Sequence, residues 1–190
     1  WGGAGSSPED VARIIDSDLA RSGQFAPVSR RDMLSYPTTA GEIFFRDWRA
    51  IDSDYVLIGR AKPLDGQRIG LDWELFDTTR QQQIATGNVV GPASEVRMSA
   101  HRIADSVYQK LTGIPGAFAT RLLYVSVTRN PTDKDFYRLT LADSDGARPI
   151  VLLESREPIL APSWSPDGNE VAYVSFETTR PAIYRQNLRT

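Results

Sequence analysis

Residue types that commonly carry chemistry are sparse in this chain of 190 residues. It has one histidine, His101, and no cysteine, so a thiol nucleophile and a disulfide framework are both excluded. The helical neighbours of His101 at i−4 and i+4 are Arg97 and Asp105, which predicts a solvated, polar helix face. The chain has no G-x-S-x-G nucleophile elbow, and one histidine without cysteine cannot build a transition-metal site. We therefore expect no enzymatic activity and no cofactor.

Three carboxylates have the spacing of a calcium-binding EF-hand loop. Asp143, Asp145 and Glu154 match its positions 1, 3 and 12. Position 6, which should be glycine, is Arg148, and position 5 has no side-chain oxygen. The flanking segments also have the pattern of strands and not of helices. We therefore interpret residues 143–146 as a hairpin turn and predict no metal site.

A polar loop over residues 129–135 separates two predicted strands, and it carries Arg129, Asp133, Lys134 and Asp135. Loops of this kind can contact partners. A solvated insertion is the commoner case, however. The sequence therefore assigns no partner-contact residue, and it assigns no catalytic, metal-ligating or cofactor-binding residue.

The overall composition excludes several classes of partner. The net charge of −2 gives no basis for binding nucleic acid or an anionic membrane. No apolar run approaches the roughly 20 residues that a membrane-spanning helix needs. The first residue is Trp1 and no signal peptide is visible, so we expect a processed or trimmed amino terminus.

Hydrophobic spacing predicts a small α/β domain over residues 1–113. Ser7 as N-cap, Pro8 as first helical residue and Gly23 as C-terminal stop predict a helix over residues 8–22. Apolar residues at helical spacing predict another helix, which Ser94 or a neighbour caps at its start and Gly113 ends. We also expect a short helix at 44–51, strands at 55–59, 69–75 and 84–90, and an edge strand at 25–28.

Residues 114–118 are predicted to be a linker, because Pro115 and Gly116 break regular structure there. From residue 119 to residue 190 the pattern changes to strands separated by turns. The clearest turn is Ser165-Pro166-Asp167-Gly168, in which Gly168 takes the left-handed position. The following strand, 171–176, is mostly apolar on both faces. A strand covered on both sides is typical of a sheet stacked between others, as in a β-propeller blade.

An internal repeat supports the propeller. Tyr124-Val125-Ser126 recurs as Tyr173-Val174-Ser175, and the segment from Tyr137 recurs at Tyr184. The spacing between the two copies is in both cases close to a blade period of roughly 40 to 50 residues. We therefore expect about one and a half antiparallel blades. A closed ring needs roughly 4 to 8 blades, so we expect the chain to be part of a longer protein.

The chain resembles the TolB family in three segments. Residues 162–168 (PSWSPDG), followed by 171–174 (VAYV), are similar to its blade repeat, which other propellers share. Residues 18–25 (DLARSGQF) resemble the first helix and following strand of its amino-terminal domain. Residues 110–118 (KLTGIPGAF) resemble its junction between domain and propeller. The resemblance covers nearly the whole chain in the right order.

This resemblance implies a non-enzymatic periplasmic scaffold with an α/β domain and a six-bladed propeller. The family belongs to the Tol-Pal system, which supports outer-membrane integrity and constriction during cell division. It binds the lipoprotein Pal through the propeller and TolA through its extreme amino terminus. The family's strand before Trp1, its TolA-binding segment and most blades have no counterpart here, so no partner-contact residue is carried over.

An alternative from another class stays open at this point. Similar blades occur in the accessory propeller of prolyl-oligopeptidase-like serine peptidases. A G-x-S-x-G motif after the last blade would favour the peptidase. Further Trp-Ser-Pro-Asp-Gly repeats to the end of the protein would favour the scaffold.

Overall fold

The computed structural model describes residues 2–3, 11–178 and 180–188. The chain divides into two compact units, Trp1–Ala119 and Thr120–Thr190. Unit 1 is an α/β unit and unit 2 consists of antiparallel sheets, so the predicted fold class is confirmed. The sequence-based domain limits, 1–113, 114–118 and 119–190, stay a prediction. None of the described helices has the length and apolar character needed to cross a membrane.

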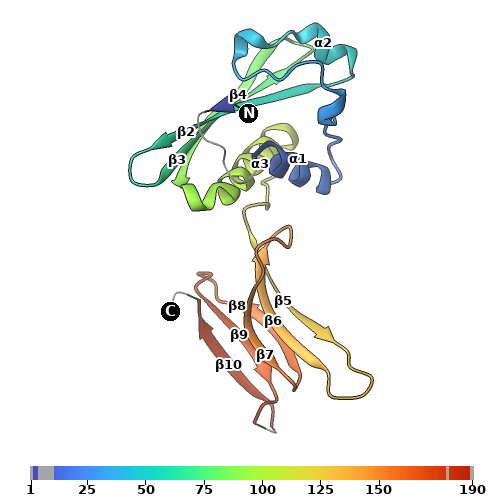
Figure 1. Cartoon of the computed structure of the whole chain (residues 1–190), viewed down its shortest axis with the longest axis vertical. Helices are drawn as coiled ribbons and strands as arrows, with labels where there is room; N and C mark the ends of the chain where they lie inside the picture. Colours follow the sequence, from blue (N-terminus) through green and yellow to red (C-terminus); the bar gives the residue numbers. More distant parts are fainter. Residues whose placement is uncertain (1, 4–10, 179, 189–190) are drawn as a thin grey trace. The chain divides into compact units, whose positions relative to one another are not determined.

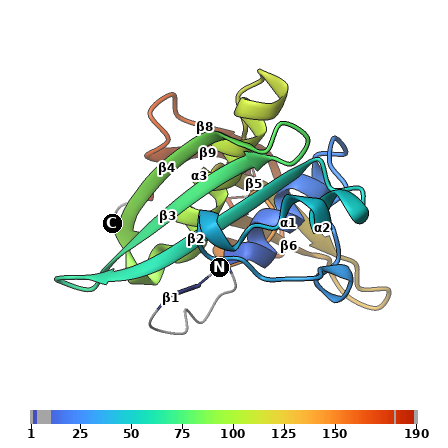
Figure 2. The same ribbon diagram turned by 90° about the horizontal axis from the view of Figure 1, so that it is seen from above.

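The sheet of unit 1 has the strand order β1-β2-β3-β4 (Figures 1 and 2). The strands β2 (Tyr55–Leu64), β3 (Arg68–Asp77) and β4 (Gln82–Pro92) form an antiparallel meander. The short strand β1 (Gly2–Gly3) pairs in parallel with β2. The three predicted strands of the meander are confirmed. The predicted edge strand at 25–28 is wrong, since these residues form no ladder and Pro27 has no N–H to donate.

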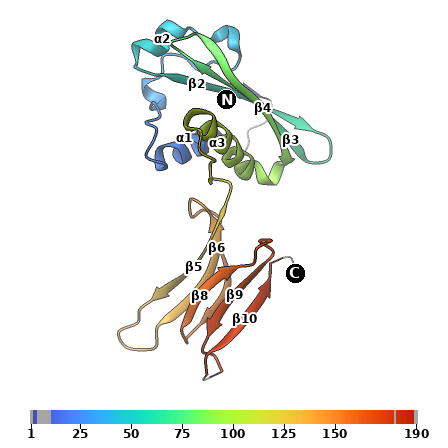
Figure 3. The same cartoon turned by 180° about the vertical axis from the view of Figure 1, so that it is seen from behind.

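Two helices cover one face of this sheet and a third covers the other face (Figures 1 and 3). The pair is α1 (Val11–Arg21) and α3 (Val96–Thr112), and the third is α2 (Phe45–Ala50). The described part of the unit also has the 3₁₀ turns η1 (Arg30–Asp32), η2 (Ala40–Glu42) and η3 (Ala93–Glu95).

The predicted helix ends are confirmed better than the starts. Gly23 and Gly113 have φ of 72° and 76°, the left-handed conformation that ends a helix. Ser7 and Pro8, the predicted start of the first helix, lie outside the described residues. Ser94 does not cap α3; it lies within η3, and the residue directly before α3, Glu95, makes no side-chain cap bond.

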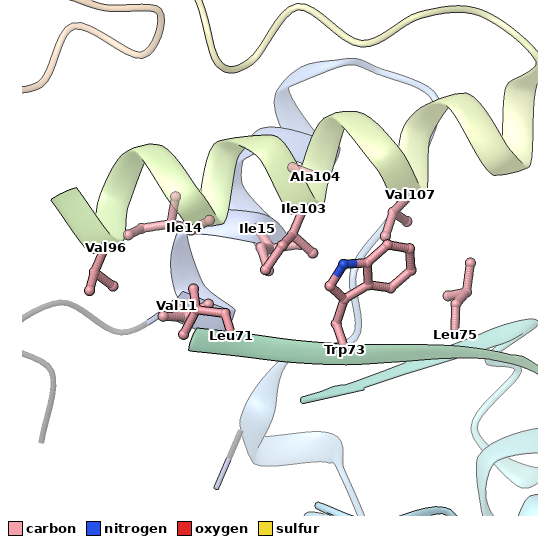
Figure 4. Packing of buried hydrophobic residues seen from close by; sticks show 11 residues of the cluster. Val11, Ile14, Ile15, Leu71, Trp73, Leu75, Val96, Ile103, Ala104 and Val107 are labelled. Carbon is pink, nitrogen blue, oxygen red and sulfur yellow. The ribbon is translucent and has the colours of Figure 1, made fainter. Parts of the chain in front are cut away.

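The strand predicted at residues 69–75 places three large side chains on the helix-covered face. Leu71, Trp73 and Leu75 point from β3 toward α3 and α1 (Figure 4). Their exposed fractions are 0%, 6% and 1%. The helices contribute the facing apolar side chains: Val11, Ile14 and Ile15 from α1 and Val96, Ala100, Ile103, Ala104 and Val107 from α3.

The described residues of unit 2 form two three-stranded antiparallel sheets, and neither closes into a ring. The first is β5 (Arg121–Thr128), β6 (Phe136–Asp143) and β7 (Ile150–Ser155). The second is β8 (Ile159–Trp164), β9 (Glu170–Ser175) and β10 (Ala182–Asn187). Leu139 of the first sheet and Ile159, Val171 and Tyr173 of the second share one buried cluster. This stacking of sheets is the packing expected of neighbouring blades.

The turn between β8 and β9 is confirmed. Gly168 has φ of 70° and donates its N–H to the carbonyl of Ser165 at 3.0 Å. Burial of β9 differs from the expectation: Val171, Tyr173 and Ser175 are buried, whereas the residues of the other face are half-buried.

The repeat is confirmed in its first strand and not in its second. Tyr124 and Tyr173 lie at corresponding places in β5 and β9. However, Tyr184 pairs with Tyr173, whereas Tyr137 pairs with Val127, three residues beyond Tyr124. The Tyr137–Tyr184 match therefore does not identify equivalent positions, because strand register depends on the intervening loop as well as on the side chains.

Candidate functional site

The single histidine lies in the buried interior and not on a solvated face, so the earlier prediction is wrong. His101 and Asp18 are both 0% exposed, and the Nδ1 atom of His101 is 2.5 Å from the Oδ2 atom of Asp18. Arg21 donates from Nη2 to the Oδ1 atom of Asp18 at 2.6 Å. A buried carboxylate requires such donors, since burial without them is costly. The pair therefore links α1 to α3.

A signal for this pair was present in the sequence. Asp18 follows Val11, Ile14 and Ile15 at helical spacing, so an acid occupies a core position of α1. An acid at such a position needs a buried partner, and the facing helix supplies the histidine 83 residues away. Neither side chain can meet a substrate from solvent, and we assign the pair to structure.

The carboxylates with EF-hand spacing are not brought together. Asp143 accepts from Arg148 Nε at 2.8 Å and from Nη2 at 3.1 Å. Glu154 accepts from Arg138 Nε at 2.8 Å, across the β6–β7 ladder. Glu154 lies opposite Arg138, which is five residues from Asp143 on β6, so the backbone positions of the two acids are separated by about 16 Å along the strand. Residues 143–146 form the predicted turn, with the Gly146 N–H donating to the Asp143 carbonyl at 2.8 Å.

The polar loop between β5 and β6 is held by ion pairs to the loop that follows β7. Asp133 accepts from Arg156 Nη1 at 3.1 Å, and Lys134 contacts Glu157. Arg156 also lies over the ring of Phe136, 5.1 Å from its centroid. These groups are largely exposed, so each pair contributes roughly 0 to 1 kcal/mol. The two loops together present a surface with both signs of charge.

The carboxylate of Asp167 organises the turn between β8 and β9. It accepts from Ser165 Oγ at 2.6 Å, and from the backbone N–H and Nδ2 of Asn169 at 3.1 and 2.6 Å. The Ser165 hydroxyl, followed by Asn169, lowers the pKa of Asp167 from 3.8 to about 2. Hydrogen bonds to the charged form favour that form. This acid is therefore a scaffold group and not a proton donor at neutral pH.

The titration of Asp167 provides a test of this turn. Because its pKa is lower in the folded state, the stabilisation is complete above pH 3.8 and is lost as the pH falls through about 2. We expect the Asp167 carboxyl carbon, followed by NMR, to titrate with a midpoint near pH 2. In Ser165→Ala the midpoint should move up toward 3.8, because the largest contribution is removed. Equal midpoints in the two proteins would contradict the described turn.

A hollow of about 440 Å³ opens in unit 1 between α1, the segment 24–37 and β2. Its lining is largely apolar and includes Ile15 and Leu57. Two of the lining residues, Ser35 and Trp48, also have a buried side-chain polar atom without a hydrogen-bond partner among the described residues.

Two family models match the chain, one in each half. The model described as the TolB amino-terminal domain matches residues 1–84. The model described as the TolB beta propeller domain matches residues 108–190. Their order is that of the two units in the structure.

Curated relatives and a solved structure agree with these matches. Tol-Pal system protein TolB of Pseudomonas syringae pv. syringae (strain B728a) is 47% identical over 190 residues, covering 100% of the chain and 44% of the relative. The protein of the same name from Pseudomonas aeruginosa PAO1 is 48% identical over 183 residues, covering 96% and 42%. The crystal structure of TolB from Acinetobacter baumannii matches with a TM-score of 0.83 and 39% identity, covering 98% of the chain and 45% of that structure. The chain thus spans less than half the length of these proteins.

Proposed function

We propose, because the chain belongs to the TolB family, that it is part of a non-enzymatic, periplasmic protein-binding scaffold of the Tol-Pal system. The observation that carries this proposal is the pair of TolB family matches, in the order of the two units. The proposed partners are the lipoprotein Pal and TolA. The proposed role is to support outer-membrane integrity and constriction during cell division. The peptidase alternative is set aside, because both halves of the chain match TolB.

The structure of unit 2 supports a binding role by its architecture. A stack of small sheets forms a rigid base, and the turns between strands project from its ends. The charged loops at residues 129–135 and 156–157 are one such group of turns. We propose that Pal binds the propeller of which this unit is a part. No individual contact residue is proposed.

The outer edge of β2 in unit 1 is open over part of its length among the described residues. The parallel pairing of β1 stops at Arg60 and Ala61, so Tyr55–Gly59 has no strand on its outer side among the described residues. The hollow beside α1 borders this open edge. We propose that the strand preceding Trp1 in the family continues β1 along this edge and fills the hollow. TolA would then bind a segment further toward the amino terminus.

A pull-down tests the proposed partnership. The protein, extended to the length of its relatives and shown to be folded, should retain purified Pal on resin. The 190-residue chain should retain much less, because most blades of the family propeller are outside it. Failure of the folded, extended protein to retain Pal would count against the proposed function.

A further inference from the structure

The segment that leads out of α3 is anchored by one carboxylate. Asp105, in the middle of α3, accepts from the backbone N–H of Phe118 at 2.7 Å through Oδ1. Its Oδ2 atom accepts from the N–H of Ala119 at 3.1 Å. Hydrogen bonds to an ionised acceptor are roughly twice as strong as neutral ones. Ala119 is also the last residue of unit 1, so the anchor holds the segment to its end.

Two further contacts hold the same segment against α3. A Cβ atom at Gly116 would lie 2.4 Å from Oδ1 and 2.5 Å from Cα of Asp105, so only glycine fits there. The Phe118 ring meets the Tyr108 ring edge to face, with centroids 5.6 Å apart and an angle of 87°. The resulting arrangement is a clamp, made of Asp105, Gly116, Phe118 and Tyr108.

Thr120, the residue after Ala119, is held within unit 2. The carbonyl of Thr120, the first residue of that unit, accepts from the N–H of Ser144 at 3.1 Å. Ser144 belongs to the turn that follows β6. The anchor in unit 1 therefore ends at Ala119 and the anchor in unit 2 begins at Thr120.

We propose that residues 113–119 are not a flexible linker but a fixed extension of unit 1. Asp105 holds this extension in place, because its carboxylate fixes the last two amides of the unit.

Amide hydrogen exchange by NMR on the full chain tests the clamp. In the unmodified chain, Phe118 and Ala119 should exchange at least tenfold more slowly than unprotected amides. Asp105→Ala removes both acceptors, so both amides should lose at least tenfold in protection. Asp105→Asn keeps one acceptor oxygen, so only one amide should lose protection. Asp65→Ala, in the exposed turn between β2 and β3, is the matched control and should change neither amide.

Two outcomes would overturn the proposal. One is unprotected exchange of Phe118 and Ala119 in the unmodified chain. The other is unchanged exchange of the Phe118 and Ala119 amides in Asp105→Ala, in a protein whose α3 amides keep their protection. If Asp105→Ala unfolds unit 1, the Asp105→Asn result decides.

Discussion

Replacing Trp73 by alanine is expected to lower the free energy of unfolding of unit 1 by about 3 to 5 kcal/mol. The side chain is 6% exposed and lies under α3 at the centre of the helix-covered face (Figure 4). Glycines flank it on both neighbouring strands, since Trp73 pairs with Gly59 of β2 and Gly87 of β4. Chemical denaturation followed by circular dichroism measures the loss. A change below about 1 kcal/mol would show that the indole does not support this core.

The indole also explains why residue 87 is glycine. A Cβ atom at Gly87 would lie 2.7 Å from Nε1 of Trp73, and two ring carbons would be 2.8 Å away. Gly87→Ala should therefore cost about 1 to 3 kcal/mol through overpacking. Gly70→Ala is the matched control in the same sheet, because its nearest contact would be an ordinary 3.5 Å. If the clash is with the indole, combining Gly87→Ala with Trp73→Ala should cost less than the sum of the two.

Removing the carboxylate of Asp18 is expected to have the second large effect, a loss of about 3 to 5 kcal/mol in Asp18→Ala. The reason is the group that remains. His101 would keep its fully buried ring without the acceptor at Nδ1, and its Nε2 atom has no hydrogen-bond partner among the described residues. Thermal and chemical unfolding of the variant measure the loss.

A double replacement separates this pairing from simple packing. Asp18→Leu with His101→Leu removes both polar groups, and replacing a buried pair by apolar residues is often neutral or stabilising. The double variant should therefore recover much of the stability lost in either single variant. If the double variant loses as much stability as Asp18→Leu or His101→Leu alone, the description of the two side chains as a hydrogen-bonded pair is contradicted.

Local patterns predicted the elements of this fold well, because they report local physics. The alternation of Leu71, Trp73 and Leu75 gave a strand with one buried face, and the structure has it. Gly113 and Gly168 were predicted as a helix stop and a turn residue, and both have positive φ. These features depend on backbone conformation and on one face of one element. They need no knowledge of a distant partner.

Features that depend on a distant partner were missed or mistaken. His101 was placed on a polar face from its helical neighbours, but its partner Asp18 is on another helix. The two acceptor bonds of Asp105 go to backbone amides of residues 118 and 119, which no side-chain pattern reveals. The Tyr137–Tyr184 match failed for the same reason, since register is a property of two paired strands.

Calorimetric titration of purified Pal into the protein, extended to the length of its TolB relatives, tests the central claim most directly. The scaffold account predicts saturable binding of Pal, and much weaker binding by the 190-residue chain. The absence of binding heat at several temperatures, with a folded protein and with Pal that binds another TolB, would contradict it.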